Sequence, residues 1–110
     1  MRTFAEFQLL GHVGKVKRVG PTLRVDVAAD YGRKDEASGE YKSNPYWNEV
    51  TLFGERLVAW ADANVKKGDL VHVRGTIRQT SYEKDGQTVY GVTLAANDFD
   101  LLGSKARAEA

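Results

Sequence analysis

Hydrophobic and polar residues alternate along most of this chain, which is the pattern of a strand with one buried face. The clearest case is Leu23, Val25 and Val27, which alternate with charged residues. The first predicted strand is long, and Gly11 and Gly14 indicate bends or bulges along it. The predicted strands contain Phe4–Leu10, Leu23–Val27, Trp47–Phe53, Val71–Arg78 and Val92–Leu102.

In the fourth predicted strand, Val71, Val73, Gly75 and Ile77 are expected to face inward.

One segment of the chain follows a helical period rather than the alternation of a strand. Between Gly54 and Gly68, apolar residues recur every three or four positions, and two lysines precede Gly68 as in a last helical turn. The residues at this spacing are Leu57, Trp60, Ala61, Asn64 and Val65, with Lys66 and Lys67 in the last turn. We expect Trp60 to fill the core rather than contact a ligand.

The element order is therefore β-β-β-α-β-β, an all-β chain with one short helix between the third and fourth strands. This is the order of the OB-fold, a five-stranded Greek-key barrel. A length of 110 residues suits one domain with a single core. We expect residues 1–103 to form that domain and residues 104–110 to form a short disordered tail.

Charge is distributed unevenly along the chain. Residues 1–34 carry seven Lys or Arg against three acids, whereas residues 35–64 carry two against six. A polyanion would therefore be drawn to the two ends of the chain. The absence of cysteine excludes disulfides and thiolate metal sites and fits an intracellular setting. The N-terminus has the features of neither a signal peptide nor a spanning helix, so no membrane contact is expected.

The sequence offers no candidate catalytic residues. His12 and His72 lie in predicted strands with no carboxylate or cysteine at ligand spacing, and we interpret them as surface or half-buried side chains. No glycine-rich phosphate loop precedes the helix. We expect no enzymatic activity, no metal and no cofactor.

Two aromatic residues lie on what should be the wet face of the third strand. If Val50 and Leu52 face inward, then Trp47 and Phe53 face outward. Such rings either pack against another subunit or loop, or serve as platforms on which single-stranded bases stack. The residues alone leave both interpretations open.

Each of two predicted loops combines an aromatic ring with nearby cations. Tyr82 lies near the tip of a hairpin that turns at Asp85-Gly86, and Tyr31 follows the second strand. The expected stacking residues are Trp47, Phe53, Tyr82 and Tyr31. The expected phosphate contacts are Arg33, Lys34, Lys67, Arg74, Arg78 and Lys84.

The stretch 47–94 resembles the central half of bacterial single-stranded DNA-binding proteins. The matching pieces are Trp-x-x-Val-x-Leu-Phe-Gly, the amphipathic helix, Lys67-Gly68 and the hairpin with Asp85-Gly86. The resemblance extends over residues 4–103. It implies an OB-fold that binds single-stranded DNA without sequence preference, usually as a homotetramer. It also implies base stacking on Trp47 and Phe53, with Tyr82 where the family commonly has a Trp.

This chain departs from the family pattern at several positions. Arg33 replaces a third usual Trp, Glu55 stands where Lys is common, and Asn48 stands where many members have an interface His. The chain ends LLGSKARAEA, without the family's linker and acidic tip that recruit replication and repair enzymes. A tetramer is still favoured over a dimer, and contacts with replication or repair proteins would use other surfaces.

We therefore expect a cytoplasmic, nucleoid-associated protein that coats single-stranded DNA during replication, recombination or repair. The alternative is an OB-fold accessory protein, like the primosomal relatives of this family, that acts through protein contacts. In that case the outer aromatic residues would form a protein interface.

Overall fold

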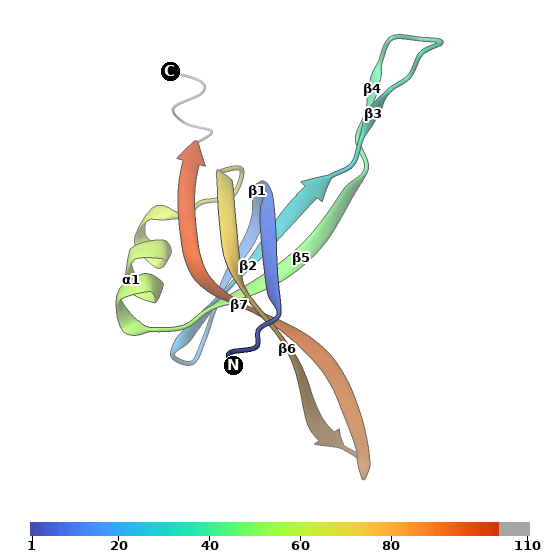
Figure 1. The fold of residues 1–110 in the computed structure, drawn as a ribbon. Helices are drawn as coiled ribbons and strands as arrows, with labels where there is room; N and C mark the ends of the chain where they lie inside the picture. The colour runs from blue at the N-terminus through green and yellow to red at the C-terminus, as the bar shows by residue number, and fades with distance from the viewer. Residues whose placement is uncertain (104–110) are drawn as a thin grey trace.

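Alternating apolar residues along five strands close this chain into a barrel (Figure 1). The structure, a computed structural model, describes residues 1–103. The barrel strands, in the order β1-β2-β5-β7-β6, are Glu6–Val19, Thr22–Asp30, Pro45–Leu52, Gln87–Gly103 and Leu70–Lys84. Neighbours are antiparallel except β5 and β7, which run parallel over three residue pairs, from Val50↔Leu94 to Leu52↔Ala96. The predicted OB-fold is confirmed.

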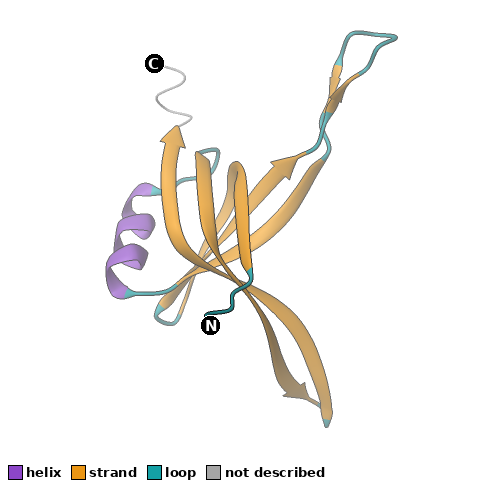
Figure 2. Cartoon of the chain, in the orientation of Figure 1, coloured by secondary structure: helices purple, strands orange, loops and turns teal. Residues whose placement is uncertain are grey.

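The barrel core consists of the inward-facing aliphatic side chains of all five strands. Leu23, Val25 and Val27 of β2 are fully buried, as their alternation predicts. The single helix of the described residues, α1 (Glu55–Asn64), lies beside the strands (Figure 2) and adds Val58 and Ala61 to this core. Complete burial of a valine or leucine side chain contributes about 1.5–3 kcal/mol. The strands are therefore held mainly by this shared core.

Two hairpins project from the barrel in different directions (Figure 1). The hairpin arm consists of residues 77–94 of β6 and β7, and it turns at Asp85-Gly86 as predicted. The second projection, residues 31–44, contains the short strands β3 (Arg33–Lys34) and β4 (Tyr41–Lys42). The sequence predicted only a turn here, so β3 and β4 are additions to the predicted fold.

Strand β1 bends where the glycines predict. Its register with β2 shifts between Val13 and Val16, so Gly14 lies in a bulge. At Gly11, a Cβ would overlap the carbonyl oxygen of Ala28, which means that the two backbones pass too closely for any side chain.

Two predictions about the helix are wrong. The helix ends at Asn64, because the next residues form a turn in which the Asp69 carboxylate accepts a hydrogen bond from the Lys66 N–H at 2.8 Å. Both predicted last-turn lysines therefore lie beyond the helix. Trp60 is 39% exposed rather than core, and its ring meets Phe99 edge-on with centroids 6.2 Å apart.

Two strand predictions also need correction. Val71, Val73 and Gly75 face inward, but Ile77 is 41% exposed because it begins the hairpin arm, which projects beyond the barrel core. Phe4 is 75% exposed and precedes β1.

The tail expected at 104–110 lies outside the described residues. No helix within residues 1–103 is long and apolar enough to cross a membrane.

Candidate functional site

A groove opens where β5 and β7 diverge. Beyond their parallel pairs, the first half of β5 and the hairpin arm separate, and the space between them measures about 640 Å³. The groove is lined by Thr22 and Arg24 of β2, by Trp47, Asn48, Glu49, Thr51 and Phe53, and by Thr80, Tyr82, Gly91, Val92, Thr93 and Leu94. The structure thus brings three of the four expected stacking residues to one surface, from two separate segments: Trp47 and Phe53 from β5 and its end, and Tyr82 from the hairpin arm.

Trp47 lies across the sheet rather than standing away from it. It pairs with Ala28 of β2, and its six-membered ring continues over Gly14 of β1. A Cβ on Gly14 would overlap this ring, so the bulge and its glycine leave the space that the indole occupies. The side chain is nevertheless 59% exposed and is open to the groove. An exposed ring that also rests against the sheet at Gly14 is suited to stacking against a flat ligand.

Phe53 and Tyr82 stand at other parts of the same groove. Phe53 follows the last residue of β5 and is 48% exposed. It also borders a second recess, which Leu57 and Arg78 line as well. Tyr82 is on the hairpin arm and pairs with Val89 of β7.

A small recess with two lysines lies on the other side of Trp47. This basic recess is lined by Gly14, Lys15, Asp26, Trp47 and Lys67. Lys67 was expected from the sequence, whereas Lys15 was missed. Its only sequence signal is its place next to a bulge glycine in the basic N-terminal third. Lys15 of β1 lies near Trp47 of β5 because both strands pair with β2.

Acidic side chains also border this surface. Glu49 lines the groove and forms an ion pair with Arg24 at 3.5 Å, and both side chains are about half exposed. Asp26 lies in the basic recess. These carboxylates lower the positive potential that the cations would otherwise create.

Other expected site residues lie away from the groove lining. The Arg74 guanidinium is 3.3 Å from the Asp98 carboxylate, so its charge is already partnered. Lys84 belongs to the last pair before the hairpin turn and does not line the groove. His72 has a carboxylate neighbour that the sequence did not suggest, because Asp100 of β7 lies 3.9 Å away. Residues 1–103 contain no cluster of three or more His, Cys, Asp or Glu side chains that could hold a metal ion.

Tyr31, Arg33 and Lys34 belong to the second projection and line a separate recess with Lys42. Tyr31 is 67% exposed and meets Tyr46 edge-on, with ring centroids 5.6 Å apart. The structure thus divides the predicted stacking residues between two surfaces, the groove and this projection.

Comparisons with known proteins agree with this geometry. Residues 4–102 match the model of the single-strand binding protein family. A single-stranded DNA-binding protein of Thermus aquaticus is 31% identical over 85 residues, which cover 77% of this chain but only 31% of that protein.

Solved structures share the fold at lower identity. A Plasmodium falciparum SSB complex with ssDNA has a TM-score of 0.68 at 19% identity and covers 96% of this chain and 98% of that one. A mitochondrial single-stranded DNA binding protein of S. cerevisiae has a TM-score of 0.68 at 21% identity, with 93% and 98% covered.

Proposed function

Because this chain belongs to the single-strand binding protein family, we propose that it binds single-stranded DNA without sequence preference. Such binding would protect DNA strands during replication, recombination or repair. The observation that carries the proposal is the groove, which gathers Trp47, Phe53 and Tyr82 from two segments of the chain.

The rings would hold bases by stacking. Every base has an apolar π-face, so a ring contributes about 1–3 kcal/mol per stacked base whatever the sequence. Trp47 is the best-supported platform, since its ring rests on Gly14 and keeps more than half of its surface exposed.

The cations would hold phosphates on either side of the rings. Lys15 and Lys67 border Trp47 in the basic recess, and Arg78 borders Phe53 in the next one. A DNA strand that stacks on both rings would therefore have Lys15 and Lys67 near its phosphates at Trp47, and Arg78 near its phosphates at Phe53. With a net charge of only +1 and carboxylates nearby, stacking would supply a larger share of affinity than in a strongly basic protein.

We further propose that the chain works as a homo-oligomer, more favourably a tetramer than a dimer. Within residues 1–103, Glu6–Leu10 of β1 pair with β6 alone, which leaves their other edge available for another strand. Leu10 and Leu102 are 57% and 55% exposed on β1 and β7, which gives apolar surface for such a contact. Light scattering on the purified protein measures the number of subunits directly.

Tryptophan fluorescence during titration with an oligothymidylate tests the binding proposal. The chain has two tryptophans, and a Trp60→Phe background leaves Trp47 as the only reporter. Binding should quench its emission, and Trp47→Ala, followed by gel shift, should weaken binding about 5- to 150-fold, equivalent to about 1–3 kcal/mol. An unchanged signal with no gel shift at low salt would reject DNA binding. It would favour the alternative, in which the aromatic residues form an interface with a protein partner.

A further inference from the structure

One carboxylate joins the two ends of the second projection, residues 31–44, which we call the β3–β4 arm. Asp30 is the last residue of β2, and its Oδ1 accepts hydrogen bonds from the backbone N–H groups of Gly32 and Asn44, each at 2.8 Å. Its Oδ2 accepts one from the Ser43 hydroxyl at 2.9 Å. The outgoing and returning chains of the arm are thus fastened to one side chain.

Packing around Asp30 reinforces this connection. The Tyr31 N–H donates to the carbonyl of Asn44 at 3.0 Å. A Cβ on Gly32 would lie 2.5 Å from Tyr41 Cζ, so this glycine lets the tyrosine cross the base of the arm. The hydrogen bonds, led by that from Asn44, lower the pKa of Asp30, which shows that they favour its charged form.

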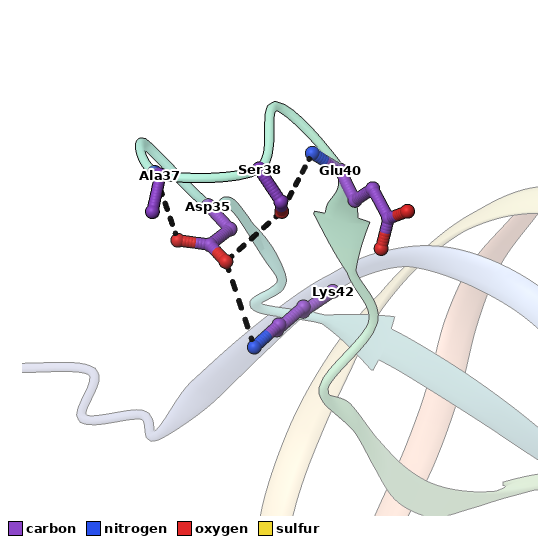
Figure 3. A network of polar contacts seen from close by, with 5 residues as sticks. All are labelled: Asp35, Ala37, Ser38, Glu40 and Lys42. Atoms are coloured by element: carbon purple, nitrogen blue, oxygen red, sulfur yellow. Dashed lines mark hydrogen bonds and ion pairs between the residues drawn. The ribbon is translucent and has the colours of Figure 1, made fainter.

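A second aspartate organises the tip of the arm (Figure 3). The Asp35 carboxylate accepts hydrogen bonds from the Ala37 N–H at 3.2 Å and the Ser38 hydroxyl at 3.0 Å. The Lys42 ammonium lies 3.7 Å from the same carboxylate. The arm therefore has its own polar framework at both ends rather than the few contacts of a flexible loop.

The barrel does not need this framework. No residue of the arm belongs to the hydrophobic core of the described chain. The polar contacts at its base and tip therefore hold the arm in one conformation without supporting the core. Order of this kind is useful when the segment must meet a ligand, because groups fixed in advance lose less conformational entropy on binding.

We propose that Asp30 is a positioning residue that fixes the β3–β4 arm so that Tyr31, Arg33 and Lys34 form a second, preorganised contact for the bound DNA strand. The inference rests on the proposed function. It gives a structural reason why the β3–β4 arm would contribute to DNA binding. Asp30 itself does not touch the DNA in this proposal. It acts through the backbone of Gly32 and Asn44.

A labelled arm tests the first half of the proposal. The chain has no cysteine, so Glu36→Cys gives a single exposed site for a spin label near the tip. The label should be restricted in the native background and mobile with Asp30→Ala, which removes both acceptor oxygens, whereas an asparagine would keep Oδ1 for the two backbone N–H groups. Ser43→Ala should loosen the arm less, because one of the three hydrogen bonds is lost. Unchanged mobility in Asp30→Ala would overturn the proposal.

A binding cycle tests the second half. Asp30→Ala should weaken oligothymidylate binding about 3- to 10-fold, as expected when a few side chains must be ordered on binding. In a Tyr31→Ala/Arg33→Ala background, the same substitution should cause no further loss. A matched control is Asp62→Ala, which should leave binding unchanged because within residues 1–103 the Asp62 carboxylate pairs only with the Arg18 side chain, at 3.5 Å.

The outcomes separate this inference from the proposed function. An equal loss from Asp30→Ala in both backgrounds, or no loss in either, would refute the positioning role. If Trp47→Ala weakens binding while Asp30→Ala does not, only the role of the arm fails. If neither variant changes binding, the groove proposal fails as well. Thermal melting should show the same barrel stability in all arm variants.

Discussion

An alanine at position 14 would push the Trp47 ring away from the sheet. Its Cβ would lie 2.5 Å from Cη2 of the indole and closer still to Cζ3. Carbon atoms in contact are about 3.5–4.0 Å apart, so the ring must move by about 1.0–1.5 Å or rotate. Gly14 does not have a left-handed φ, so alanine brings no backbone strain of that kind and the change acts on the ring.

Displacing the ring should reduce binding without removing the platform. The full stacking contribution is about 1–3 kcal/mol, and a partial loss of about 1 kcal/mol corresponds to a roughly fivefold weaker affinity. The assay is the oligothymidylate titration in the Trp60→Phe background. The indole emission of the unbound Gly14→Ala protein should also shift, because the ring loses its contact with the sheet.

Gly91→Ala is the matched control for this experiment. Gly91 lines the same groove, but among residues 1–103 a Cβ there meets only the Thr80 hydroxyl oxygen at 3.6 Å, an ordinary contact. Its affinity and quenching should equal those of the parent protein. If Gly14→Ala also binds like the parent while Trp47→Ala is weak, then the fixed position of the ring contributes nothing and our account of Gly14 is wrong.

Three further predictions concern charge, the second ring and pH. Lys67→Ala should reduce the slope of log K against log salt by about 0.7, whereas Tyr82→Ala should weaken binding at every salt concentration with the slope unchanged. Tyr82→Phe should bind like the parent protein in the same titrations, because the ring remains; a clear loss would assign the role to the hydroxyl. Hydrogen bonds lower the pKa of Asp30 below its ordinary 3.8, so its contacts persist at all higher pH and are lost as pH falls through the lowered value. The spin label at position 36 should accordingly become mobile only below about pH 3.8; release near neutral pH would contradict this sign.

Alternation predicted the strands wherever one face of a strand meets the core without interruption. It failed at Ile77, because this residue begins the hairpin arm, which leaves the barrel core, and an apolar pattern does not record where a strand leaves the barrel. Thr51 shares the alternation of Trp47 and Phe53, which predicts the wet face, but it is only 8% exposed. It lies between Arg24 of β2 and Ala95 of β7, which cover it from both sides. Coverage of this kind depends on the neighbouring strands and not on the strand's own sequence.

The site could be predicted only in part, because the positions of several side chains depend on neighbouring strands. Outward placement identified Trp47 and Phe53, since large rings on a wet strand face conflict with simple alternation. Lys15 and Asp30 were missed because their neighbours are distant in sequence. Lys15 reaches Trp47 across an intervening strand, and Asp30 bonds to Asn44, fourteen residues away. A surface charge acquires a role only through such tertiary neighbours.

The short parallel contact between β5 and β7 also has a consequence for how this protein folds. Val50 and Leu94 are far apart in the sequence, whereas β1–β2 and β6–β7 are local hairpins. Local hairpins form at little entropic cost, but the parallel contact must close a long loop first. We therefore expect β5 and β7 to join late in folding. Because the two walls of the groove meet only there, a chain emerging from the ribosome would gain its groove only after the last strand has been made.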